Sequence, residues 1–154
     1  ILKPTIDRTL YHLVYLTRHA KGITVFMEAS AKLNLVQCRT RAQAKQKKRE
    51  DKSGQRELFS SADWMPMEKH ADLAEVKLYW LGRLKNSPCQ FGIEELADML
   101  EESTWFEGDL QVAFGELEKE GKVKNLDANR KRRSKFVHFS EKHGKGENLV
   151  KVLS

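Results

Sequence analysis

The sequence predicts a mainly helical α+β fold, a winged helix-turn-helix preceded by a strand–helix arm and a basic linker. Two observations carry this prediction. Between Asp72 and Gly121, apolar residues recur at helical spacing in three blocks, each with its own start or stop signal. A short hairpin pattern with a basic tip follows at residues 122–139. The fold class points to a binding module, because such a fold carries no chemistry by itself.

The first 35 residues are predicted to be an arm or the remnant of a larger α/β domain. The apolar run from Leu10 to Leu16 suits a strand buried on both faces, with a helical turn as the alternative. Helical spacing follows from Ile23 to Leu33. A strand and a helix cannot enclose a core alone, so this part is expected to pack on something else.

Residues 36–70 are predicted to be a basic linker and docking segment. From Arg39 to Arg56 the sequence holds eight basic residues against two acidic ones, and it lacks aromatic residues. Such a composition is typical of a solvated connection. A helical extension that frays by Ser53 is the alternative for its first part.

The winged block, residues 71–154, begins with two helices. Asp72 and Glu75 have the spacing of a capping box, and Pro88 follows the first helix. The apolar stripe of that helix comprises Leu73, Val76, Trp80, Leu81 and Leu84. The second helix begins near Gly92 and places on one face Ile93, Leu96, Ala97 and Leu100.

A third helix and two strand halves complete the block. Thr104 and Glu107 predict a capping box, and Gly121 predicts the C-terminal cap. The third helix is expected to bury Phe106, Leu110, Ala113, Phe114 and Leu117. The strand halves are Val123 with its neighbours and residues 136–139. Leu149, Val150, Val152 and Leu153 predict a last short element that docks on some other surface.

The tip of the hairpin is the strongest candidate site. Six basic residues are assigned to it or to its first strand: Lys124, Arg130, Lys131, Arg132, Arg133 and Lys135. Such cations neutralise phosphates and displace counterions, so the hairpin predicts a salt-dependent contact with nucleic acid, expected to be double-stranded DNA. The net charge of +6 agrees with an anionic partner. A solvated turn is the alternative.

The outward face of the third helix favours a different partner. It carries Gly108, Gln111, Val112, Gly115 and Lys119. Only Gln111 and Lys119 could contact a nucleic acid groove, and the acids on both flanks of this face would repel phosphates. Gly108, Val112 and Gly115 form a smooth stripe that suits another backbone. This stripe predicts a contact with a protein partner or with a second copy of the chain.

The sequence shows no pattern typical of an enzyme, a cofactor site or a metal site. It contains no glycine-rich phosphate loop, no Gly-x-Ser-x-Gly and no His-Glu-x-x-His. Cys38 and Cys89 are too few for a disulfide framework or a metal knuckle, so free thiols and a cytoplasmic protein are expected. No apolar run approaches the roughly 20 residues of a membrane span, and no membrane partner is expected.

The run Thr17-Arg18-His19-Ala20-Lys21-Gly22, within residues 13–27, resembles the late part of the three-Cys-motif partner proteins. These are bacterial proteins with a methyltransferase-like α/β domain and a C-terminal winged helix, which residues 72–139 resemble. The resemblance implies a C-terminal part of a larger protein from a mobile-element or defence-associated system. The glycine-rich turn of a methyltransferase-like domain is absent from the sequence, so no catalytic residue carries over.

Three functions remain open at this point. The first is a non-enzymatic winged helix that binds nucleic acid through its hairpin. The second is a winged helix for protein interaction or dimerisation. The third is the edge of a methyltransferase-like enzyme.

Overall fold

A computed structural model of the protein describes residues 2–3, 6–9, 15–55, 71–128, 134–142 and 144–152. The chain forms two compact units, which we describe separately. One unit comprises residues 1–16 and 29–69, and the other comprises residues 17–28 and 70–154. The elements form a mainly helical α+β fold with a small three-stranded antiparallel sheet, as the sequence predicts.

The first unit holds a two-stranded hairpin and most of one long helix. Strands β1 (Leu2–Lys3) and β2 (Ile6–Thr9) pair antiparallel. The strand predicted at Leu10 to Leu16 is not present at its end, because Tyr15 and Leu16 lie outside any strand. Residues 10–14 fall outside the described residues.

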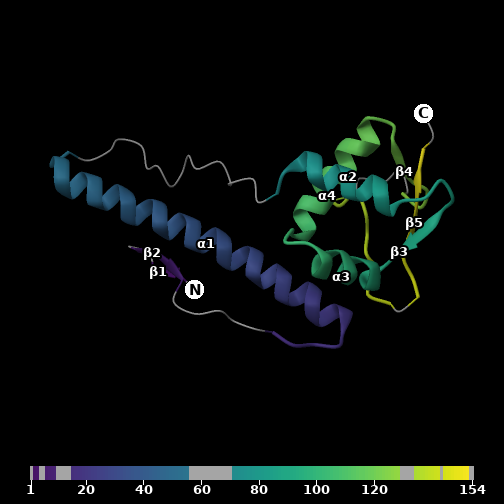
Figure 1. The fold of residues 1–154 in the computed structure, drawn as a ribbon, viewed down its shortest axis with the longest axis horizontal. Helices are drawn as coiled ribbons and strands as arrows, with labels where there is room; N and C mark the ends of the chain where they lie inside the picture. Colours follow the sequence, from purple (N-terminus) through teal and green to yellow (C-terminus); the bar gives the residue numbers. More distant parts are fainter. Residues whose placement is uncertain are drawn as a thin grey trace. The chain divides into compact units, whose positions relative to one another are not determined.

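Helix α1 (Ala20–Ser53) runs unbroken through the first part of the predicted linker (Figure 1). Between Gly22 and Gly54 the sequence contains no glycine or proline, and it is rich in the good helix formers Ala, Gln, Lys and Arg. Gly54 ends the helix with a φ of 68° and donates its N–H to Glu50 O at 2.8 Å. The helical alternative therefore describes residues 36–53 better than an irregular linker does.

The second unit contains the three predicted helices, α2 (Leu73–Arg83), α3 (Ile93–Glu102) and α4 (Glu107–Lys119) (Figure 1). Asp72 caps α2 by accepting from Ala74 N at 3.0 Å. The capping box predicted for Thr104 and Glu107 is wrong. Asp109 reaches back instead and accepts from Phe106 N at 2.9 Å, so α4 begins at Glu107.

Gly121 ends α4 as the sequence predicts. Its φ is 70°, and its N–H donates to Glu118 O at 3.0 Å. Lys122 N donates to Leu117 O at 3.0 Å, which completes a Schellman motif. The chain therefore turns directly from α4 into the next strand.

One hydrophobic core lies between these helices and the sheet. Trp80 is fully buried at its centre, and its Nε1–H donates to Leu110 O at 3.0 Å. Its ring lies 5.2 Å from that of Phe114 and 5.5 Å from that of Phe91. Ile23 and Met27, from the part of α1 that belongs to this unit, pack against the same core.

The sheet differs from the predicted hairpin. Strands β3 (Cys89–Phe91), β5 (Glu147–Lys151) and β4 (Val123–Asn125) pair antiparallel in the order β3-β5-β4. The partner of β4 is therefore β5, and not residues 136–139, which form no strand. Those residues alternate between exposed and buried as a strand would, but their backbone is hydrogen-bonded by side chains of other elements. The elements follow in the order α2, β3, α3, α4, β4 and β5, with a long connection between β4 and β5. This order is that of a winged helix.

Tyr79, Arg83 and Glu102 join α2 to the end of α3. Tyr79 Oη donates to Glu102 Oε2 at 2.7 Å, and Arg83 Nη1 donates to the same oxygen at 2.7 Å. Burial and the hydrogen bond to Glu102 raise the pKa of Tyr79 to about 12. The ring of Tyr79 also meets Trp105 edge-on at 5.2 Å.

We predict that shortening Leu110 destabilises the second unit, whereas shortening Leu78 does not. Leu110 is fully buried, so Leu110→Ala should lower the free energy of unfolding by about 2–5 kcal/mol. Leu78 lies on α2 with 70% exposure, and Leu78→Ala should change the free energy of unfolding by less than about 0.5 kcal/mol. Urea denaturation followed by circular dichroism measures both. Equal effects would contradict the position of the core.

We also predict that the phenol of Tyr79 ionises at a higher pH than an ordinary tyrosine side chain. The raised pKa of Tyr79 means that the folded state binds this proton more tightly than the unfolded state. Its contribution to stability is complete below pH 10 and is lost as the pH rises through about 12. Absorbance at the phenolate band during alkaline titration should show the ionisation of Tyr79 as a step near pH 12. The step should vanish in Tyr79→Phe and persist in Tyr15→Phe.

Candidate nucleic-acid interface

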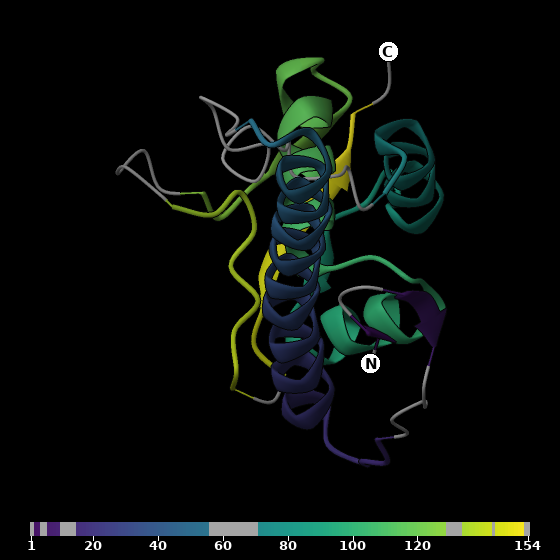
Figure 2. The same cartoon turned by 90° about the vertical axis from the view of Figure 1, so that its left-hand side faces the viewer.

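The wing is the connection between β4 and β5, residues 126–146. Its described parts are residues 126–128, 134–142 and 144–146, and Figure 2 shows the stretch after residue 134, in yellow-green, as an extended path. Two of its buried side chains, Val137 and Phe139, belong to the hydrophobic core. The second half of the wing is therefore packed on the domain and is no simple return strand.

Gly115 of α4 is the position against which Phe136 of the wing packs. A Cβ atom at this position would fall 2.5 Å from the ring of Phe136, so only glycine allows the ring to lie where it does. Gly115 is buried as a result. The open surface predicted for another backbone at this position is filled by Phe136 of the same chain.

Gln111, one turn before Gly115, holds the backbone of the same stretch. Its Nε2–H donates to Val137 O at 2.7 Å, and its Oε1 accepts from Phe136 N and Val137 N, both at 3.0 Å. A side-chain amide offers donors and acceptors, and here both kinds are used within the chain. The structure therefore gives Gln111 a positioning role for the wing.

A buried polar pair fixes the wing from the sheet. Asn125 and Glu147 are 4% and 8% exposed, and Asn125 Nδ2 donates to Glu147 Oε2 at 2.7 Å. Asn125 Nδ2 also donates to Phe136 O at 3.0 Å, and His138 N donates to Glu147 Oε2 at 2.8 Å. Buried polar groups that are satisfied in this way specify one arrangement. Neither residue stands out in the sequence as a site, although alternation places Asn125 on the buried side of β4 with Val123.

Three of the acids along α4 and its end form ion pairs. Glu107 Oε1 lies 2.6 Å from Lys135 Nζ, and Glu116 Oε1 lies 2.8 Å from Lys119 Nζ. The ion pair with Lys119 lowers the pKa of Glu116. Such pairs contribute little to stability at the surface, where water and salt screen them.

Glu120 is the third of these acids. It accepts from Lys122 at 2.7 Å and from Lys77 at 2.7 Å. The two ammonium groups hold the pKa of Glu120 down to about 2. These pairs partly neutralise the acidic rim that the sequence places around this helix.

The remaining predicted site residues fall into two groups. Lys124, Gly108 and Lys119 are exposed, and Val112 is 54% exposed on the outward face of α4. The basic run Arg130, Lys131, Arg132 and Arg133 lies outside the described residues.

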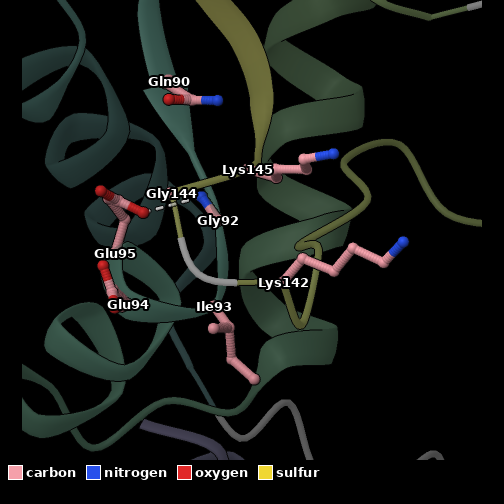
Figure 3. A pocket seen from close by; sticks show the side chains of 8 residues that line it. All are labelled: Gln90, Gly92, Ile93, Glu94, Glu95, Lys142, Gly144 and Lys145. Atoms are coloured by element: carbon pink, nitrogen blue, oxygen red, sulfur yellow. Dashed lines mark hydrogen bonds between the residues drawn. The ribbon is translucent and has the colours of Figure 1, made fainter.

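A small hollow lies at the start of α3, where β3 and the second half of the wing meet (Figure 3). Its volume of about 20 Å³ suits a single water molecule. Glu95 is engaged there in accepting from Gly92 N at 2.7 Å. The side chains of Lys142 and Lys145 point away from the carboxylates of Glu94 and Glu95. The hollow therefore offers no arrangement for catalysis.

Two further observations concern the part of the chain that the structure describes. No group of three or more His, Cys, Asp or Glu side chains is placed to hold a metal ion there. None of its helices is both long and apolar enough to cross a membrane.

Comparison with known proteins agrees with the geometry. The model of one family, the GMT-like wHTH domain, matches residues 45–130, more than half of the chain. The chain belongs to this family. No curated protein and no solved structure matches it significantly. The match to the GMT-like wHTH domain begins in the second half of α1 and ends within the wing, so that it includes α2, α3, α4 and β4.

We predict that Gln111→Leu releases the wing without unfolding the domain. The substitution removes three hydrogen bonds to residues 136 and 137, so the amide protons of Phe136 and Val137 should exchange faster with solvent. Native-state hydrogen exchange measures this, with amides of β5 as an internal reference. Val112→Ala, at the neighbouring exposed position, should leave both amides protected. Unchanged exchange of these amides in Gln111→Leu would contradict the positioning role of Gln111.

Proposed function

We propose that this GMT-like wHTH domain is a non-enzymatic module that binds double-stranded DNA through its wing. The observation that carries the proposal is the anchoring of the wing at both ends of its basic run. Asn125 fixes one side, and Phe136 and Val137 fix the other, and Arg130 to Arg133 lie between them in the sequence. Cations held on a short anchored segment lose little conformational entropy when they meet phosphates.

Helix α4 supports this assignment, because it offers few side chains that could contact DNA bases. Gln111, the side chain on α4 best suited to read a base, is engaged with the wing backbone. Gly108 and Val112 have no polar group to offer, and Lys119 is paired with Glu116. We therefore expect phosphate contacts to dominate, with weak dependence on DNA sequence and strong dependence on salt.

A protein contact through α4 is the second candidate. The observation that favours it is an open surface on α4. Val112 is exposed there, and a Cβ atom added to the neighbouring Gly108 would have no other atom within 4 Å. Val112→Arg probes this surface without touching the wing. Gly115→Arg is a poorer probe, because it would displace Phe136. If sedimentation shows self-association and Val112→Arg leaves it unchanged, this surface is not the contact.

The origin of the module is the third part of the proposal. The resemblance of residues 13–27 and 72–139 to three-Cys-motif partner proteins supports a bacterial, cytoplasmic parent with a methyltransferase-like domain before this one. The domain division at residues 1–35, 36–70 and 71–154 belongs to the same proposal. The gene that encodes the chain tests it, because a cofactor-binding half should then precede Ile1.

We predict that the basic run controls affinity for DNA. Replacing Arg130, Lys131, Arg132 and Arg133 by Ala should remove most of the binding of a DNA duplex, measured by fluorescence anisotropy at several salt concentrations. Arg132→Ala/Arg133→Ala should reduce the slope of log K against log salt by about 1.8, or 0.9 for each lost phosphate contact.

Lys142→Ala/Lys145→Ala is the matched control, because it removes the same charge from the same connection beside α3. It should change the slope much less. Binding that does not depend on salt, or equal effects of the two pairs, would overturn the role of the wing.

A further inference from the structure

The second half of α1 carries a line of exposed lysines that the wing does not explain. An irregular linker would scatter its charges, but a continuous helix fixes them at about 100° per residue. Lys45, Lys48 and Lys52 follow one another at steps of three and four, so their Cβ atoms fall within a sector of about 60°. We call these three residues the lysine stripe.

The stripe presents positive charge to solvent. All three lysines are exposed, and none of them forms an ion pair with another described residue. The acids of this segment, Glu50 and Asp51, lie about 90° or more from the centre of the stripe. The stripe is about 10 Å long, since each residue of a helix adds 1.5 Å. A DNA strand carries one phosphate for every 3.4 Å of its axis, so a line of this length can face several phosphates.

The composition of the segment favours nucleic acid over a membrane surface. A helix that lies on a bilayer inserts bulky apolar side chains such as Trp, Phe or Leu. Between Arg39 and Gln55 the only apolar residues are Ala42 and Ala44, and Ala42 is buried. The segment can therefore attract an anionic partner but has nothing to anchor it in lipid.

We infer that the lysine stripe of α1 is a second phosphate-binding surface of this protein, which contacts the backbone of duplex DNA without reading its bases. The stripe belongs to the first unit and the wing to the second, so the two surfaces are carried by different parts of the chain. The inference does not depend on the role of the wing. A chain with both surfaces engages more phosphates than the wing alone and should show a steeper dependence on salt.

The test compares two variants that each lose two positive charges from α1. Lys45→Gln/Lys48→Gln changes the stripe. Arg39→Gln/Lys47→Gln changes exposed residues that lie more than about 120° from the centre of the stripe around the helix. Glutamine keeps helix propensity, and circular dichroism checks the helix content. Each variant is titrated into a labelled duplex DNA of mixed sequence at several salt concentrations.

The stripe variant should reduce the slope of log K against log salt by about 1.8, and the control by less than half of that. Equal changes, or none, would overturn the inference. If the stripe variant binds DNA normally but loses binding to vesicles rich in anionic lipid, the surface serves a membrane and the inference is wrong. A normal slope in the variants of the wing with a reduced slope in the stripe variant would refute the proposed function alone.

A measurement on the unmodified protein keeps the inference testable if a variant loses helix content. Acylation of lysine amines is followed by mass spectrometry with and without the duplex. Lys45, Lys48 and Lys52 should be protected by DNA, and Lys47 should not. Equal reactivity of all four with and without DNA would refute the surface.

Discussion

The missing side chain at Gly115 is the constraint on which the wing depends. Because no Cβ is present, the ring of Phe136 lies directly against α4, and Gln111 one turn earlier hydrogen-bonds the backbone of residues 136 and 137. Val137 and Phe139 then reach the core. Each contact is small, but together they hold residues 136–139 on the domain, so the loss of freedom on ordering this stretch is met by burial.

The same arrangement engages the polar groups of α4 in contacts within the chain. The wing packs onto α4 and engages the side-chain amide of Gln111, which could otherwise contact a nucleic-acid groove. The ion pairs of Glu107, Glu116 and Glu120 engage carboxylates that would otherwise repel a phosphate. By our proposals, the surfaces left for an anionic partner are the basic run of the wing and the lysine stripe of α1. Binding of DNA through such surfaces is governed by counterion release, so both DNA-binding titrations are made at several salt concentrations.

Local patterns predicted the helices well and the sheet poorly. The stripes around Trp80, Leu96 and Leu110 predicted α2, α3 and α4, since helical periodicity and caps depend on residues within a few positions. Residues 136–139 alternate like a strand, but alternation tells which side chains turn inward and says nothing of the partner. The predicted box paired Glu107 with Thr104, but α4 begins two residues later than that box implies, with Phe106 as its N-cap and Asp109 accepting from Phe106 N.

The sequence by itself determined the three helices, many of the core residues that they contribute, the glycine cap at Gly121 and the basic character of the wing. The tertiary structure decided that β5 pairs with β4, that Gln111 and Gly115 serve the wing, and that Asn125 meets Glu147. The reason is the range of the interactions. Periodicity and capping act within one element, whereas strand pairing and buried hydrogen bonds join residues about ten to sixty positions apart.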